Sequence, residues 1–250
     1  MNVKVLGVIP ARYSSTRFPG KPLAIIDGKS MIQRVYEQAK LCPGISHLIV
    51  ATDDSSIENH VELFGGKVIL TSTHHQSGTE RCSEVCELLS SKGQDFDVII
   101  NIQGDEPFIH PGQIEQVAGC FGTLETTIAS LMKKITTAEE LHNPNIVKVV
   151  ADNNGKALYF SRAAIPYLRD REPGQWIDHQ SFYKHVGIYG YRTDILMRIV
   201  KLPPSVHETA ESLEQLRWLD SGFEIKMEET FFESVSVDTP ADLLKLTNRH

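Results

Sequence analysis

The chain has 250 residues and a formal net charge of −7 at neutral pH. This length suffices for one domain with a substantial core, or for one domain with an insertion. The negative charge argues against general nucleic-acid binding, and no apolar run is long enough to cross a membrane. Because the N-terminus also shows no apolar region before a cleavage site, we expect a cytoplasmic protein without membrane insertion.

The first half of the chain alternates apolar runs with helical patterns. Strands are expected at residues 3–9, 47–52, 67–70, 98–101 and 128–131, and helices at residues 30–40, 55–64, 79–89 and 111–121. Such alternation predicts an α/β fold with a mostly parallel central sheet and helices on its faces. Loops that follow parallel strands meet at one edge of the sheet, and ligands bind there.

The second half has a different pattern. Residues 145–151 and 156–160 flank Asp152-Asn153-Asn154-Gly155, which predicts a hairpin. Residues 163–182 are polar and irregular, 185–191 and 234–237 have strand character, and 208–221 and the segment from Pro240 onward have helical character. We therefore expect a single domain over residues 1–250 in which residues 130–235, approximately, form a smaller β-rich subdomain.

A stiff basic loop follows the first predicted strand. Residues 10–23 contain three prolines that restrict the backbone, and three cations, Arg12, Arg17 and Lys21. A loop of this kind at the carboxyl end of a strand suits a polyphosphate, although a solvated basic loop is the simpler alternative. The spacing is not that of a P-loop, because Ser15 stands at the first glycine position and Pro22 replaces the hydroxyl residue.

Two aspartates are candidate ligands for a divalent cation. Asp105 lies just after the strand at residues 98–101, where a carboxylate can hold Mg²⁺ against a phosphate. Its alternative role is to form a turn before Pro107. Asp238 could cap the last helix, but Thr239 can serve as the cap instead and leave Asp238 available for the metal.

A further set of polar residues could bind a small, hydroxylated, anionic substrate. His185 and Tyr189 lie four apart on a predicted strand, and therefore on one face of it. Ordinary surface polarity is the alternative for all members of the set, which are Gln103, Arg162, His185, Tyr189, Glu214 and Gln215.

The chain resembles one family nearly from end to end, and nine segments carry the resemblance. They are residues 9–23 (IPARYSSTRFPGKPL), 50–54 (VATDD), 75–81 (HQSGTER), 101–107 (NIQGDEP), 143–150 (NPNIVKVV), 158–162 (LYFSR), 185–191 (HVGIYGY), 213–217 (LEQLR) and 237–240 (VDTP). In these segments the chain resembles the 3-deoxy-manno-octulosonate (Kdo) cytidylyltransferases, or CMP-Kdo synthetases. Many sugar nucleotidyltransferases share the first segment loosely, whereas QGDEP and HVGIYGY are far more specific.

The resemblance implies a Rossmann-like nucleotidyltransferase fold and a homodimer that catalyses CTP + Kdo → CMP-Kdo + diphosphate with Mg²⁺, for lipopolysaccharide synthesis. It implies that residues 130–235 contribute to sugar binding and to the dimer. The implied nucleotide site comprises Arg12, Ser14, Arg17, Lys21, Ser77, Gly78, Arg81 and Asp105. The implied metal ligands are Asp105 and Asp238, the catalytic set adds Arg12 and Lys21, and the sugar site is the polar set named above. Residues 168–181 resemble the family least.

The residues and the resemblance predict the same chemistry, in which the anomeric hydroxyl of Kdo attacks the α-phosphorus of CTP in line. The basic loop and the metal would neutralise the leaving diphosphate. Three alternatives stay open: a cytidylyltransferase for another acidic sugar, a nucleotidyltransferase acting on a sugar 1-phosphate, and a nucleotide-binding protein without activity.

Overall fold

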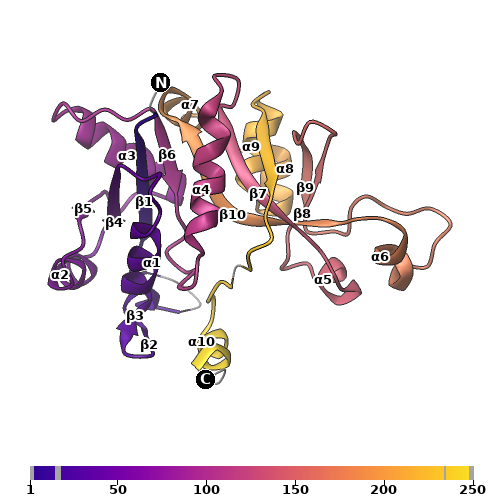
Figure 1. The fold of residues 1–250 in the computed structure, drawn as a ribbon, viewed down its shortest axis with the longest axis horizontal. Helices are drawn as coiled ribbons and strands as arrows, with labels where there is room; N and C mark the ends of the chain where they lie inside the picture. Colours follow the sequence, from indigo (N-terminus) through magenta and orange to yellow (C-terminus); the bar gives the residue numbers. More distant parts are fainter. Residues whose placement is uncertain (1–2, 15–17, 234, 248–250) are drawn as a thin grey trace.

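The structure is a computed structural model that describes residues 3–14, 18–233 and 235–247. In the first half, strands and helices alternate as the sequence predicts (Figure 1). Their ends lie within two residues of the expected ones, except that the strand expected at 128–131 continues to residue 134. The strands are β1 (Val5–Ala11), β4 (His47–Thr52), β5 (Val68–Leu70) and β6 (Val98–Asn101), and the helices are α1 (Met31–Lys40), α2 (Ser55–Leu63), α3 (Gly78–Ser90) and α4 (Pro111–Gly119). Short elements fill the connections: η1 (Lys21–Leu23), β2 (Ile25–Ile26), β3 (Lys29–Ser30) and η2 (Cys120–Gly122).

The second half supplies further strands to the same sheet. The strands are β7 (Ile128–Lys134), β8 (Lys148–Ala151), β9 (Ala157–Ser161), β10 (Tyr183–Arg192) and β11 (Ile225–Glu229). The helices are α5 (Ala138–His142), η3 (Pro173–Gln175), α6 (Trp176–His179), α7 (Thr193–Ile199), α8 (Val206–Glu211), α9 (Gln215–Asp220) and α10 (Pro240–Thr247). The predicted hairpin is confirmed, because β8 and β9 pair antiparallel.

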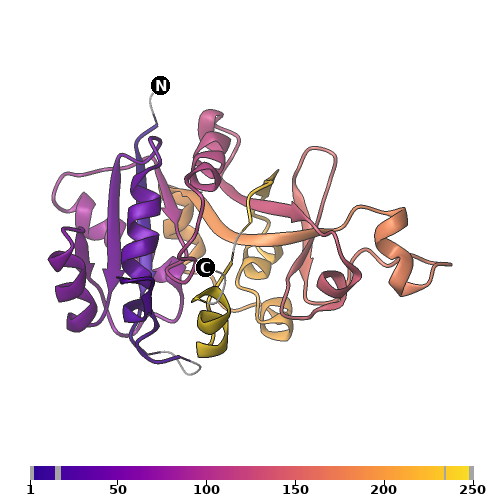
Figure 2. The ribbon, with the colours of Figure 1, turned by 60° about the horizontal axis from the view of Figure 1, so that its bottom comes forward.

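The main sheet has the strand order β11-β7-β10-β6-β1-β4-β5. Strand β10 is antiparallel to both of its neighbours on this path, and the other four pairs are parallel. Strand β8 pairs with one end of β10 and carries β9 with it. From this end the chain extends through α5 and α6, at the opposite end of the molecule from α2 (Figures 1 and 2).

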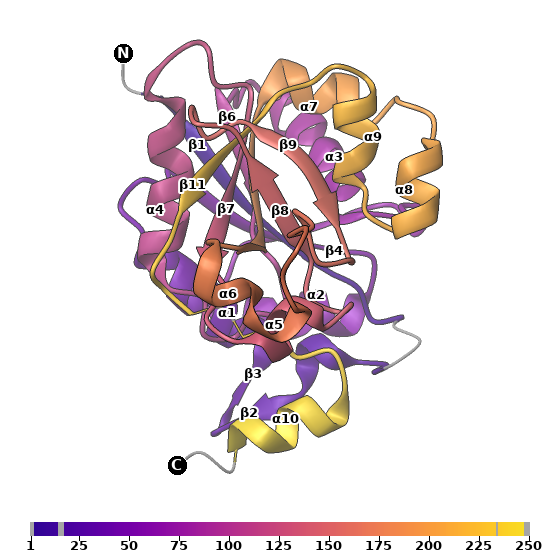
Figure 3. The same ribbon diagram turned by 90° about the vertical axis from the view of Figure 1, so that its right-hand side faces the viewer.

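Helices cover both faces of the sheet, as expected. In β1, Leu6 and Val8 face one core, whereas Val5 and Ile9 face the other. Helices α3, α7 and α9 pack on the first face, and α1, α2 and α4 pack on the second; Figure 3 shows α4 on one side of the sheet and α3, α7 and α9 on the other. Strands buried on both faces explain why the sequence reads as continuous apolar runs.

One predicted helix is two helices. The pattern over residues 208–221 suggested one helix with Leu213 and Leu216 inward; both side chains are buried, but the chain breaks between α8 and α9. Ser212 takes the left-handed conformation at φ 52° and caps α8. The break has no glycine or proline to signal it, and it places Glu214 at the start of α9.

The prediction of a strand at residues 234–237 is wrong for the described residues, since residues 235–237 do not pair with any strand. The structure instead forms β11, which pairs parallel with β7 and was not predicted. After β11 the chain crosses to the first half, where Val237 donates its N–H to the carbonyl of Asp105 at 2.9 Å. Val237 is buried with Ile26 and Met31, and α10 lies against β2 (Figure 3). No helix in the described parts of the chain is long and apolar enough to span a bilayer.

Candidate active site

The order in which the parallel strands are added to the sheet changes direction at β1. Strand β4 lies on one side of β1 and β6 on the other, so the loops that follow β1 and β6 diverge from neighbouring strand ends. A cavity of about 350 Å³ opens there. The loop after β6 approaches the end of β1 closely there, because a Cβ on Gly104 would lie 2.6 Å from the carbonyl oxygen of Pro10. Glycine at this position therefore allows the loop to lie against the strand.

Ten of the predicted site residues line this cavity. They are Arg12, Lys21, Ser77, Gly78, Arg81, Gln103, Asp105, Tyr189, Glu214 and Asp238. They come from the loop after β1 and from η1, the start of α3, the loop after β6, β10, the start of α9 and the segment before α10. Ser14 is exposed and does not line the cavity, and Arg17 lies outside the described residues.

Backbone hydrogen bonds fix the part of the basic loop that carries Lys21. Gly20, at φ 69°, donates its N–H to Tyr13 at 2.9 Å, and its carbonyl accepts from Leu23 at 2.9 Å. The positive φ suits glycine, and Pro22 stiffens the turn that follows. The backbone of Lys21 is thus fixed at the mouth of the cavity, with its side chain directed to the acidic residues.

The two predicted metal ligands lie on either side of one cation. The ammonium of Lys21 lies 2.7 Å from Oδ2 of Asp105 and 3.5 Å from Oδ1 of Asp238. Thr239 and Asp242 form a reciprocal cap at the start of α10, as predicted, so capping does not require Asp238. Two carboxylates that converge on a cation fit Mg²⁺, which binds one or two carboxylates together with substrate phosphates and water.

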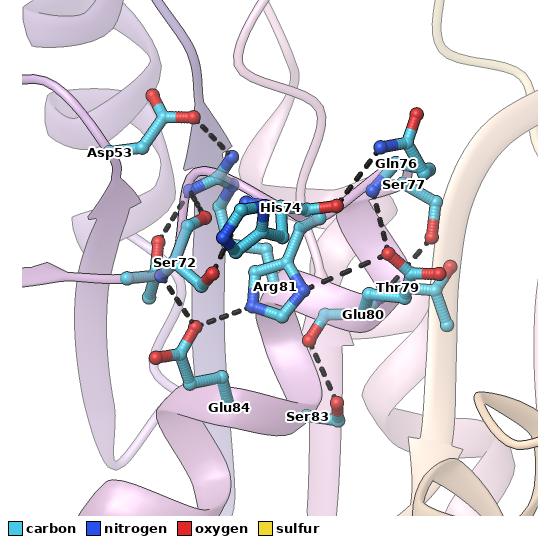
Figure 4. A network of polar contacts seen from close by, with 12 residues as sticks. Asp53, Ser72, His74, Gln76, Ser77, Thr79, Glu80, Arg81, Ser83 and Glu84 are labelled. Atoms are coloured by element: carbon cyan, nitrogen blue, oxygen red, sulfur yellow. Dashed lines mark hydrogen bonds and ion pairs between the residues drawn. The ribbon is translucent and has the colours of Figure 1, made fainter.

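A hydrogen-bonded network fixes the start of α3, which also lines the cavity (Figure 4). The buried guanidinium of Arg81 donates to Asp53 at 2.8 Å and also to the hydroxyl of Thr71. Ser77 caps α3 by accepting from the N–H of Glu80 at 3.2 Å. The hydroxyl of Thr79, in the first turn of α3, donates to Glu214 at 2.8 Å, and both residues line the cavity.

A buried hydroxyl group and a partly buried carboxyl group form the part of the wall that comes from β10 and the start of α9. Burial raises the pKa of Glu214, and hydrogen bonds from Thr79 and Ser77 oppose this rise. Tyr189 is 7% exposed, and its hydroxyl has no hydrogen-bond partner among the described residues. Gln103 donates to the carbonyl of Gly187 at 2.9 Å, which joins the loop after β6 to β10. This wall suits a ligand with several hydroxyl groups.

Three predicted sugar-site residues do not line the cavity. Arg162 donates its Nε to the carbonyl of Glu211 at 2.7 Å and its other nitrogens to the carbonyls of Pro144 and Ser212. Gln215 is buried on α9. The third residue is His185.

His185 lies behind Tyr189, with ring centroids 5.1 Å apart, which confirms that the two share a face of β10. Nε2 of His185 lies 2.9 Å from the hydroxyl of Ser130, and that hydroxyl lies 2.8 Å from the carbonyl of Ile188. Because the hydroxyl donates to the carbonyl, it accepts the Nε2–H of a neutral imidazole. Desolvation lowers the pKa of His185 to about 3.

Asn101 and Asp53 were not among the predicted site residues. Asn101 ends β6, lines the cavity and is 4% exposed, and its Oδ1 has no hydrogen-bond partner among the described residues. Asp53 orients Arg81. Both residues lie in segments that resemble the family, and a polar residue at the end of an apolar strand or directly after it is a signal that could have identified each of them.

Comparisons with known proteins agree with this geometry. A family model described as "Cytidylyltransferase" matches residues 6–228. The 3-deoxy-manno-octulosonate cytidylyltransferase of Parabacteroides distasonis is 51% identical, with 97% of this chain and 96% of that protein covered. Its namesake in Thermodesulfovibrio yellowstonii is 49% identical, with 94% of each covered. A solved structure of CMP:2-keto-3-deoxy-manno-octonic acid synthetase with CTP has a TM-score of 0.90 and 44% identity, and covers 98% of this chain and 97% of that one.

Proposed function

The chain is a nucleotidyltransferase of the 3-deoxy-manno-octulosonate cytidylyltransferase family, and from its cavity we propose how it converts CTP and Kdo to CMP-Kdo and diphosphate. One observation carries the proposal. The cavity at the reversal point of the sheet combines Arg12 and Lys21 with two converging carboxylates, Asp105 and Asp238. Cations and a carboxylate pair at one site are what phosphoryl transfer requires.

In the proposed reaction, Arg12 and Lys21 bind the triphosphate and neutralise the diphosphate as it leaves. Asp105 and Asp238 hold Mg²⁺, which when bound lowers the pKa of the attacking hydroxyl and offsets charge on the α-phosphate. Ser77, Gly78 and the start of α3 receive the nucleoside. Glu214, Tyr189 and Gln103 orient the sugar so that its anomeric hydroxyl is in line with the α-phosphorus.

We also propose a cytoplasmic homodimer that supplies activated Kdo to lipopolysaccharide synthesis. Residues 130–235 contribute to the dimer contact. This part of the chain exposes large apolar side chains, among them Leu158 at 57%, Tyr167 at 76% and Phe231 at 84%. Such side chains favour association when they gather on one surface. Sedimentation velocity gives the oligomeric state directly, and a single species of monomer mass would contradict the dimer.

The first test is diphosphate release with CTP, Mg²⁺ and Kdo, with and without a chelator. We expect rapid release that requires both Kdo and the metal. Release with another acidic sugar, such as a sialic acid, but not with Kdo would retain the mechanism and change the substrate. Release with UTP and a sugar 1-phosphate would indicate the other nucleotidyltransferase class. Binding of CTP without turnover with any sugar would contradict enzymatic activity.

A further inference from the structure

We propose that Lys21 occupies the metal position before the nucleotide binds, so that the divalent cation can enter only when a triphosphate draws the lysine away. The idea rests on the proposed function, because it assigns a second role to a residue of the same site. Lys21 would thus act as a built-in cation that makes metal binding dependent on nucleotide binding.

The distances support this role. The Lys21 ammonium lies 2.7 Å from Asp105 and 3.5 Å from Asp238, and its side chain is only 15% exposed. A backbone hydrogen bond of 2.9 Å from Val237 to Asp105 keeps these acidic residues close together. Two carboxylates held this close repel each other, and a cation between them relieves the repulsion. The ammonium supplies that cation without any metal.

The lysine and the metal compete for the same position between Asp105 and Asp238. Mg²⁺ binds carboxylate oxygens at about 2.0–2.1 Å and completes its shell with oxygens, so an ammonium in hydrogen-bond contact with the same oxygens would be displaced by crowding and by like charge. The Lys21 side chain can move even though its backbone is fixed, because the four-carbon stem rotates freely. Arg12 lines the same cavity, and in the proposed reaction the triphosphate binds there. Its phosphate oxygens would give the displaced ammonium new partners.

Linkage gives this arrangement a consequence for the order of binding. A ligand that draws Lys21 away from the carboxylates strengthens metal binding, and bound metal strengthens nucleotide binding by the same factor. Metal alone has to displace the ammonium without compensation, so it should bind weakly. Removing the ammonium should therefore tighten metal binding while it weakens catalysis, which is the opposite of what loss of an ordinary ligand or clamp residue does.

The test is Mn²⁺ binding to the whole protein without nucleotide, measured by the electron paramagnetic resonance of free Mn²⁺. We expect Lys21→Met and Lys21→Gln to bind Mn²⁺ about tenfold more tightly than the wild type, or more. Their turnover should fall roughly 10²-fold. Lys29→Met is the matched control, because Lys29 also pairs with a carboxylate, that of Glu37 at 2.6 Å, but does not line the cavity. The double variant Lys21→Met/Asp105→Asn should lose the added affinity.

Equal Mn²⁺ affinity in the wild type and in folded Lys21 variants would overturn the proposal. So would micromolar binding of Mn²⁺ to the wild type alone, a measurement that needs no variant. The diphosphate-release assay separates this failure from failure of the proposed function. If the wild type releases diphosphate but the Lys21 variants bind Mn²⁺ no more tightly than the wild type does, only the role of Lys21 is rejected. Absence of turnover with every sugar and nucleotide rejects the function, while the titration still reports on Lys21.

Discussion

The two sides of the cavity are built in different ways. On the side proposed for the nucleotide (the nucleotide side), Arg12, Lys21 and Asp105 follow parallel strands, and the topology brings the ends of those strands to one edge. On the side proposed for the sugar (the sugar side), Tyr189 comes from antiparallel β10 and Glu214 from the corner between α8 and α9. There Arg162 and His185 bond to the chain itself rather than facing the cavity. Because parallel topology brings strand ends together, local sequence is enough to place the residues of the nucleotide side at the site. The positions of the residues on the other side depend on long-range packing.

The largest effect expected from this contrast is on the nucleotide side. Asp105→Ala should lower kcat by roughly 10³-fold, because the variant loses a partner of Lys21 and one of the two carboxylates that would hold the metal in the proposed reaction. The fold should persist, since Asp105 is part-exposed and its backbone carbonyl still accepts from Val237. Steady-state diphosphate release measures the effect. Asp194→Ala, an exposed acidic residue outside the cavity, is the control, and near-normal turnover of Asp105→Ala would refute the metal assignment.

Arg162 should behave in the opposite way, through stability. Its guanidinium joins the 211–212 corner to Pro144 by three hydrogen bonds to carbonyls. Arg162→Ala should lower the free energy of unfolding by about 2–3 kcal/mol, since bonds from a charged donor are lost and the carbonyls lose their partners. Urea unfolding measures this loss.

Arg162→Lys is the matched variant, because it keeps the charge but cannot reproduce the planar set of donors. If Arg162 acts only through the stability of the corner that carries Glu214, the apparent kcat should fall with the fraction of folded protein while KM for Kdo stays unchanged. A large rise in KM for Kdo in an Arg162→Lys protein of normal stability would instead support direct sugar binding, and would remove the contrast between the two sides.

The same contrast explains how much the sequence could predict. Strands β4 and β6 have the predicted bounds because apolar residues buried on both faces leave an unambiguous pattern. The break at Ser212 was missed, since a serine at positive φ has no local signature and is fixed by contacts from Glu211 to Ser161 and Arg162. Strand β11 was missed because only pairing with β7 distinguishes its sequence, which carries charges at three of five positions, from a loop. The periodicity of a short segment carries no information about such long-range contacts.

His185 should produce a smaller effect, one that depends on pH. Its pKa is about 3 in the folded protein and near 6.5 when unfolded, so the unfolded state binds the proton first as the pH falls. The free energy of unfolding therefore has its full value, as far as His185 is concerned, above about pH 6.5, and it decreases as the pH falls toward 3. At pH 5 the loss is about 2 kcal/mol.

His185→Gln keeps a donor for Ser130 but cannot titrate in this range. Between pH 7 and pH 5 the variant should therefore lose about 2 kcal/mol less stability than the wild type in urea unfolding. Parallel pH profiles for the two proteins would show that His185 is hydrated, and so more available to a substrate than its bond to Ser130 suggests.

The smallest effect concerns the segment that brings Asp238 to the nucleotide side. Thr239 and Asp242 cap α10 reciprocally, at 3.3 Å and 3.0 Å, and Leu243 packs on the small core of Ile26, Met31 and Val237. Thr239→Ala should weaken the helix by about 1 kcal/mol, and Thr239→Ser should not. Because Asp238 precedes the cap directly, the Ala variant should need several times more Mg²⁺ for half-maximal turnover at an unchanged maximal rate. Hydrogen exchange of the α10 amides measures the local loss. Faster exchange with an unchanged Mg²⁺ requirement would mean that the bond from Val237 to Asp105 alone positions Asp238.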